Sequence, residues 1–113
     1  MSEKVGRYAN QLMRGLVEIL MLSVIAERTS HGYHIAKEIE RRSSGYLRLT
    51  ASTVYSALRR LEDEGLVQSA WQDVAHSHRR CYWLTGKGRE MLSWKLRELN
   101  RFLAATEQVM AGG

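Results

Sequence analysis

The hydrophobic pattern of this chain changes its period at Gly65, and this change constrains the fold more than any other feature. Before Gly65, apolar residues recur at steps of three and four, which is typical of amphipathic helices. After it, Leu66–Trp71 and Arg80–Leu84 are short and rich in Leu, Val, Trp and Tyr, as antiparallel strands are. From Leu92 to Met110 the steps of four and three return. We therefore expect a mainly α fold with one small β-hairpin.

Two helices are predicted in the N-terminal part of the chain. The first covers Val5–Ala26, where apolar residues form one stripe. Ser30 is placed to cap the second, because a serine hydroxyl accepts hydrogen bonds from the free amides of a helix start. The run Ser43–Gly45 breaks this second helix.

The third predicted helix has the clearest boundaries. It follows an extended segment at 46–49, and Thr50 is placed to cap its start. The helix runs through Glu64, and Gly65 suits the left-handed position just past its end.

The hairpin and a last helix complete the predicted elements. The segment Gln72–Arg79 is expected to form a polar loop at the hairpin tip, and Thr85 is placed to cap the last helix. This order of elements is that of a winged helix-turn-helix domain, predicted here over residues 1–85, with an added dimerisation helix over residues 86–110 in one compact unit. Residues 111–113 are expected to fray.

Composition narrows the functional class. The 113 residues carry 17 Lys and Arg against 12 Asp and Glu, a net charge of +5 that attracts polyanions. The chain is short enough for one domain, and the lone Cys81 cannot form an internal disulfide. The N-terminus has no signal-peptide pattern and no apolar run reaches a membrane span, so we expect a cytoplasmic protein without a membrane partner. Because no catalytic constellation or phosphate-binding loop is present in the sequence, we expect neither an enzyme nor a cofactor.

Three motifs make the sequence similar to one family. They are the HGY at residues 31–33, the run TVYSALRRLEDEGL at Thr53–Leu66, and RCYWLTGKG at Arg80–Gly88. With these motifs the chain resembles the PadR family of bacterial transcriptional regulators from about Leu12 to Leu103. It lacks the prolines that members often carry near the start of the third helix, and its single helix after the wing places it with the shorter members.

The third helix carries the candidate DNA-reading face. A helical wheel places Val54, Leu58 and Leu61 on a core face, and hydroxyl and arginine side chains on the opposite face. Such a face suits the major groove of DNA. The alternative is a solvated face, with the two arginines paired to Asp63 and Glu64. The resemblance favours DNA binding and implies that two tyrosine hydroxyls lie near the DNA backbone. The predicted DNA-binding residues are Tyr33, Lys37, Ser52, Thr53, Tyr55, Ser56, Arg59, Arg60, Arg79 and Arg80.

The last helix carries an apolar stripe in a heptad rhythm, which calls for a partner helix. The resemblance implies a two-fold interface with the first part of the first helix. The alternative is that the stripe packs only on its own domain. The predicted dimer-interface residues are Leu92, Leu96, Leu99, Phe102, Leu103 and Met110.

Two smaller hypotheses concern ligands. Some relatives bind flat aromatic compounds between paired helices, so a small aromatic or hydrophobic effector is a candidate partner, with ordinary interface packing as the alternative. The corresponding positions are Leu12, Ile19, Trp94, Leu99 and Phe102. His76, His78 and Cys81 raise the question of a metal site, but they fall short of a four-ligand zinc set, and we expect none.

The sequence therefore predicts a homodimeric DNA-binding regulator. We expect a repressor of an inverted-repeat operator that a small-molecule effector relieves. The alternative is a winged-helix adaptor that binds an acidic protein partner and shows no preference among DNA sequences.

Overall fold

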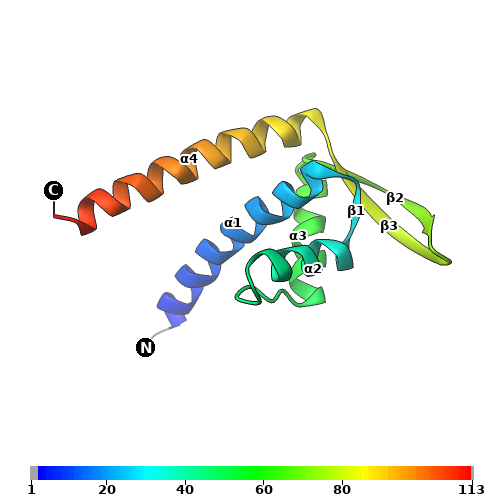
Figure 1. Ribbon diagram of the computed structural model, residues 1–113, viewed down its shortest axis with the longest axis horizontal. Coiled ribbons are helices and arrows are strands. Elements are labelled where there is room, and N and C mark those ends of the chain that lie inside the picture. Colours follow the sequence, from blue (N-terminus) through cyan, green and yellow to red (C-terminus); the bar gives the residue numbers. More distant parts are fainter. Residues whose placement is uncertain (1–2, 113) are drawn as a thin grey trace.

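The structure, a computed structural model, describes the backbone of residues 3–112 and the side chains of residues 13–73 and 75–112. Over this range the chain forms four helices and one sheet (Figure 1). No helix in the described part of the chain is long and apolar enough to cross a membrane. The elements are α1 Glu3–Glu27, β1 Ser30–His31, α2 Gly32–Arg42, α3 Ala51–Asp63, β2 Val67–Val74, β3 Ser77–Leu84 and α4 Gly86–Met110.

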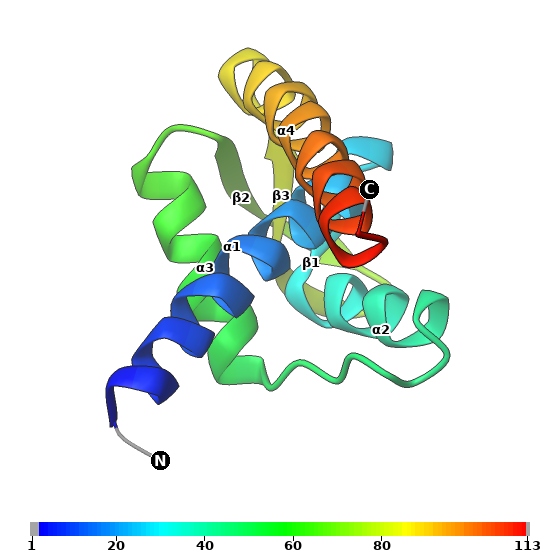
Figure 2. The same ribbon diagram turned by 90° about the vertical axis from the view of Figure 1, so that its left-hand side faces the viewer.

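Helix α1 separates two parts of the molecule. Figure 1 shows α2 and α3 below α1 and α4 above it, and Figure 2 shows α4 again above α1, with α3 to its left and α2 to its lower right. The β2–β3 hairpin projects from the end at which α1 meets β1, while the free ends of α1 and α4 point the opposite way (Figure 1). The predicted mainly α fold with a small hairpin is confirmed, and the face that carries α2, α3 and the hairpin is turned away from α4.

One hydrophobic core joins these elements. The predicted core face of α3 is confirmed, because Val54, Leu58 and Leu61 are at most 1% exposed. They pack with the fully buried α1 residues Met21 and Leu22 and with residues of α2, β2 and β3. Each such side chain contributes about 1.5–3 kcal/mol by leaving water.

Leu92 also belongs to this core, with 8% of its surface exposed. Its prediction as a dimer-interface residue is therefore corrected. The first turns of α4 pack on α1 and β3, so the start of the apolar stripe is covered by the chain itself.

The predicted caps of α3 and α4 are confirmed. The hydroxyl of Thr50 accepts a hydrogen bond from the amide of Thr53 at 3.1 Å, and that of Thr85 accepts one from the amide of Gly88 at 2.9 Å. Gly65 adopts the expected left-handed conformation with φ 77°. These local signals fix where the two helices begin and where α3 gives way to β2.

The predicted cap of α2 was wrong. The Nδ1 atom of His31 accepts the hydrogen bond from the amide of His34 at 3.2 Å, while the buried Ser30 hydroxyl donates to the carbonyl of Arg28. Ser30 lies in the two-residue strand β1, which the sequence did not predict, so the N-cap position of α2 falls to His31.

The predicted boundaries of the hairpin were also wrong. Strands β2 and β3 continue up to the pair Val74 and Ser77, so only Ala75 and His76 form the turn. These two residues have φ 45° and 68°, the left-handed values that a two-residue turn requires. Most of the expected loop is therefore strand, and Arg79 lies within β3 opposite Gln72.

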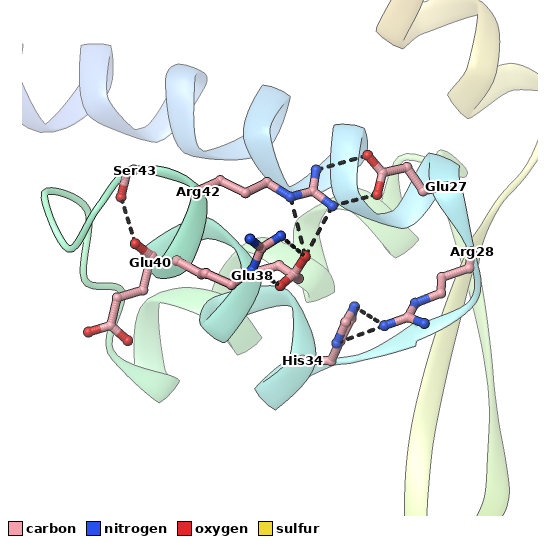
Figure 3. Close-up of polar contacts among 8 residues, drawn as sticks. Glu27, Arg28, His34, Glu38, Glu40, Arg42 and Ser43 are labelled. Atoms are coloured by element: carbon pink, nitrogen blue, oxygen red, sulfur yellow. Dashed lines mark hydrogen bonds and ion pairs between the residues drawn. The ribbon is translucent and has the colours of Figure 1, made fainter.

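Salt bridges join the C-terminal ends of α1 and α2 (Figure 3). Arg42 donates to Glu27 at 2.6 and 2.8 Å and to Glu38 at 3.2 Å. Hydrogen bonds from Arg41 and Arg42 lower the pKa of Glu38 to about 2. Because Arg42 and Glu27 remain about half open to solvent, this pair contributes little stability, but it links the C-terminal end of α1 to that of α2.

Gly88 provides a test of how α4 is seated on the sheet. A Cβ atom at this buried position collides with the backbone carbonyl of Leu66, whereas a Cβ at Gly86 meets nothing. We expect Gly88→Ala to lower the free energy of unfolding by about 3 kcal/mol and Gly86→Ala to leave it unchanged or slightly raised. Urea denaturation measures both, and equal stability of the two variants would contradict this packing.

His31 gives the fold a dependence on pH. Burial lowers the pKa of His31, and the positive charges of Arg79, His34 and Arg28 lower it further. The folded state therefore binds fewer protons than the unfolded state, whose histidines titrate near pH 6.5. Neutral His31 thus stabilises the folded state above that pH, and this contribution to the free energy of unfolding is lost as the pH falls. Protonation also removes the Nδ1 acceptor that caps α2.

We expect the free energy of unfolding to fall between about pH 7.5 and pH 5, and His31→Asn to reduce the slope. Asparagine caps helices well and does not titrate, and His34 remains in both proteins. Urea titrations at several pH values measure the slopes, and parallel profiles for the two proteins would rule out this role of His31.

Candidate nucleic-acid interface

The outer face of α3 is open to solvent. Ser52, Tyr55, Ser56 and Arg59 are all exposed, while the opposite side of the same helix is buried in the core. Thr53 is exposed too, and its hydroxyl accepts a hydrogen bond from that of Thr50 at 3.0 Å. The helix thus presents small hydroxyl groups in its first turns and one arginine further along.

Arg60 is less exposed than Arg59 and turns toward α1, so its predicted DNA contact is not supported by the arrangement of this face. Its Nε atom donates to Glu18 of α1 at 2.9 Å, and the side chains of Arg60 and Glu18 are only 33% and 12% exposed. Arg60 therefore ties α3 to α1. The alternative pairing with Asp63 or Glu64 is not found either. Arg59 forms no ion pair with any side chain that the structure describes.

The start of α2 packs closely on α3 at Gly32. A Cβ atom at Gly32 would lie 2.9 Å from Cζ of Tyr55, so the tyrosine ring packs where only glycine leaves room. Tyr55 remains about half exposed, and Tyr33 is 62% exposed beside it on α2. The Nζ atom of Lys37 lies 5.4 Å from the centre of the Tyr33 ring and so is held near the same surface.

The hairpin brings aromatic and basic groups to this face. The Trp71 ring stacks on His78 with ring centres 5.0 Å apart, and the Arg80 guanidinium lies 5.7 Å from the Trp71 ring. Arg80 also lies 3.9 Å from Glu62. The Nη1 atom of Arg79 lies 3.0 Å from Nε2 of His31, the ring nitrogen that carries the proton when Nδ1 accepts from the His34 amide.

These elements enclose a hollow between the hairpin, the start of α2 and α3, called here the wing hollow. Its volume is about 570 Å³. A smaller hollow of about 380 Å³ between α2 and α3 shares Tyr33 and Tyr55 with it. Sequence analysis did not assign His31 or Trp71 to the interface, because the two residues are brought together only by the pairing of β1 and β2 with β3. The wing hollow is lined by His31, Tyr33, Tyr55, Trp71, His78, Arg79, Arg80 and Tyr82.

The predicted interface residues of α4 lie along a surface that becomes more open toward its end. Leu99 is half-buried and Leu96 is 38% exposed, whereas Phe102 and Met110 are 64% and 74% exposed. Leu103 is about half exposed. Beyond its first turns, α4 therefore carries apolar side chains that the chain itself does not cover.

The predicted effector positions do not share one environment. Ile19 packs against the core, whereas Phe102 is exposed and Trp94 lies half-exposed in a shallow hollow with Met91. The Leu12 side chain lies outside the described residues.

The wing histidines and the cysteine are also separated. Cys81 is buried in the sheet, and His78 contacts Asp73 at 3.0 Å. Among the described residues, no group of three or more His, Cys, Asp and Glu is arranged to hold a metal ion.

Comparisons with known proteins agree with this arrangement. The family model of the transcriptional regulator PadR-like family matches residues 21–93, a range that includes α2, α3 and the hairpin. Transcriptional regulator Rv3488 of Mycobacterium tuberculosis is 34% identical over 89 residues, which are 79% of this chain and 80% of that protein.

Solved structures share the fold over most of the chain. A transcriptional regulator from Clostridium thermocellum, Cth-833, is 27% identical with a TM-score of 0.78, covering 96% of each chain. A PadR family transcription regulator from Clostridium difficile is 28% identical with a TM-score of 0.73, covering 83% of this chain and 97% of that one. The chain therefore belongs to the PadR-like family of transcriptional regulators and has their winged-helix fold.

Proposed function

We propose that this protein is a homodimeric repressor that binds an inverted-repeat operator in double-stranded DNA. The observation that carries the proposal is the open outer face of α3, whose inner face is fixed in the core. A helix held in this way can enter the major groove without rearrangement of the domain.

The side chains of this face divide into two roles. Ser52 and Ser56 lie near the start of α3, where hydroxyl groups reach base edges, and Arg59 is placed for a guanine or a phosphate. Tyr33 and Lys37 of α2 flank α3 and suit the DNA backbone. Phosphate contacts of this kind position the protein, while the base contacts specify the sequence.

Dimerisation follows from the uncovered part of α4. Leu96, Leu103 and Met110 are exposed in the single chain, and burying each leucine against a second subunit is worth about 1.5–3 kcal/mol. A two-fold axis near α4 would place two copies of α3 about 34 Å apart, the length of one DNA turn. The operator is then an inverted repeat.

Release from DNA would come from a ligand held between the subunits. Phe102 is an exposed aromatic side chain of α4, and Leu99, three residues before it, is half-buried. A flat aromatic or hydrophobic effector stacked between two copies of α4 changes the distance between the copies of α3 and so relieves repression. Because Phe102 is open to solvent in one chain, this site requires the second subunit.

The paired arginines of α3 test the DNA interface. We expect Arg59→Ala to weaken binding to duplex DNA about tenfold without changing the unfolding midpoint, because Arg59 is exposed. Arg60→Ala is the matched control, and we expect it to lower the unfolding midpoint because it leaves Glu18 unpaired in a half-buried site.

Fluorescence anisotropy with labelled duplex over a salt series measures the affinities, and thermal unfolding measures the midpoints. Wild-type affinity must fall steeply with salt if several phosphates are contacted. An affinity independent of salt, or an Arg59→Ala variant that binds like the wild type, would contradict the proposed interface. The adaptor alternative predicts that no duplex is preferred.

A charged substitution in the apolar stripe of α4 tests whether this stripe forms the dimer interface. We expect Leu103→Glu to convert the protein to a monomer while its unfolding stays cooperative, because Leu103 is about half exposed in the single chain. Arg97→Glu places the same charge on the opposite face of α4 and is expected to leave the dimer intact. Sedimentation velocity measures the mass, and a wild-type monomer or a dimeric Leu103→Glu variant would refute this interface.

A further inference from the structure

Trp71 is an exposed aromatic side chain whose orientation is fixed. It lies on β2, an edge strand of the sheet, and 58% of its surface is open to solvent. His78 of β3 stacks on its ring with an angle of 10° between the planes, and Arg80 lies above the ring. An aromatic group held in this way loses little conformational freedom when it meets a partner. The core does not account for Trp71, since the ring lies outside it.

The ring forms one wall of the wing hollow, opposite elements already assigned to the DNA interface. Tyr33 of α2 and Tyr55 of α3 line the same hollow and are themselves exposed. The surface therefore runs without interruption from the open face of α3 to the hairpin. A partner that follows α3 along this surface reaches Trp71.

The charge of the hollow selects the chemistry of that partner. Arg79 and Arg80 line it, and none of its described lining residues carries a carboxylate. Two carboxylates that do not line the hollow contact its lining groups: Asp73 lies 3.0 Å from His78, and Glu62 lies 3.9 Å from Arg80. A partner that combines negative charge with an apolar face matches these groups, and the sugar–phosphate backbone of DNA has this combination.

We propose that Trp71 is a DNA-contacting residue of the hairpin, packing on a deoxyribose whose phosphate lies by Arg80 in the wing hollow. His78 is a positioning residue, because it holds the indole ring through the stack. The proposal rests on the proposed function and adds a contact that lies outside the three sequence motifs. Trp71 contributes apolar contact, whereas Arg80 contributes charge.

Because Trp71 contributes apolar contact and Arg80 contributes charge, substitutions at the two positions should change the salt dependence of DNA affinity differently. We expect Trp71→Ala to weaken duplex binding about tenfold, the loss of a well-packed aromatic contact, at every salt concentration. The slope of log affinity against log salt should stay unchanged. Arg80→Ala should instead make that slope shallower by about one. Trp71→Phe keeps an apolar ring and should recover most of the affinity, and His78→Ala should lose part of it with an unchanged slope.

Anisotropy on the full-length protein measures these values, and thermal unfolding confirms that the exposed substitutions leave the fold intact. Trp83→Phe is the control for a tryptophan outside the hollow and should bind like the wild type. If the wild type binds duplex DNA and Trp71→Ala binds equally well, the role of Trp71 is refuted while the DNA-binding function stands. A change of salt slope in Trp71→Ala would also refute it. If the wild type binds no duplex, the proposed function fails and this contact fails with it.

Discussion

Burial of one face of α3 is the interaction on which the rest of the structure depends. Val54, Leu58 and Leu61 are removed from water by α1, α2 and the sheet, and together they supply several kcal/mol of stability. Because the helix is fixed on that side, its other side is presented to solvent at a constant angle. The Arg60–Glu18 ion pair between α3 and α1 fixes the helix further. A rigid exposed face is what recognition of a DNA groove needs.

Short contacts then bring the other two elements of the interface to α3. Gly32 allows the Tyr55 ring to approach α2, and β1 attaches the start of α2 to the hairpin through strand pairing. His31 takes part in both contacts, since its Nδ1 atom caps α2 and its Nε2 atom lies 3.0 Å from the Arg79 guanidinium of β3. The relative placement of α2, α3 and the hairpin is thus decided within a few residues around position 31. The half-buried His31 imidazole therefore touches two of the three elements of the candidate interface.

Helix ends that depend on neighbouring residues could be predicted from the sequence, whereas contacts between residues far apart in the chain could not. Thr50, Thr85 and Gly65 act on their own neighbours, so the ends of α3 and the start of α4 were correctly predicted. The hairpin turn was missed because Ala75 and His76 are not the residues that usually adopt positive φ. The partner of Arg60 lies 42 residues away, beyond the reach of any helical-wheel argument. Leu92 has the spacing of an interface residue, and only the packing of α4 on α1 shows that it is core.

The most direct measurement for the central claim is the selection of bound duplexes from a random-sequence pool by the wild-type protein. If the outer face of α3 reads base edges in a symmetric dimer, one inverted repeat should be enriched, with half-site centres about one helical turn apart. Substitution of an enriched base pair should then cost about 1–3 kcal/mol of binding free energy. A pool that stays random through successive rounds, despite retained binding, would contradict sequence recognition by this face.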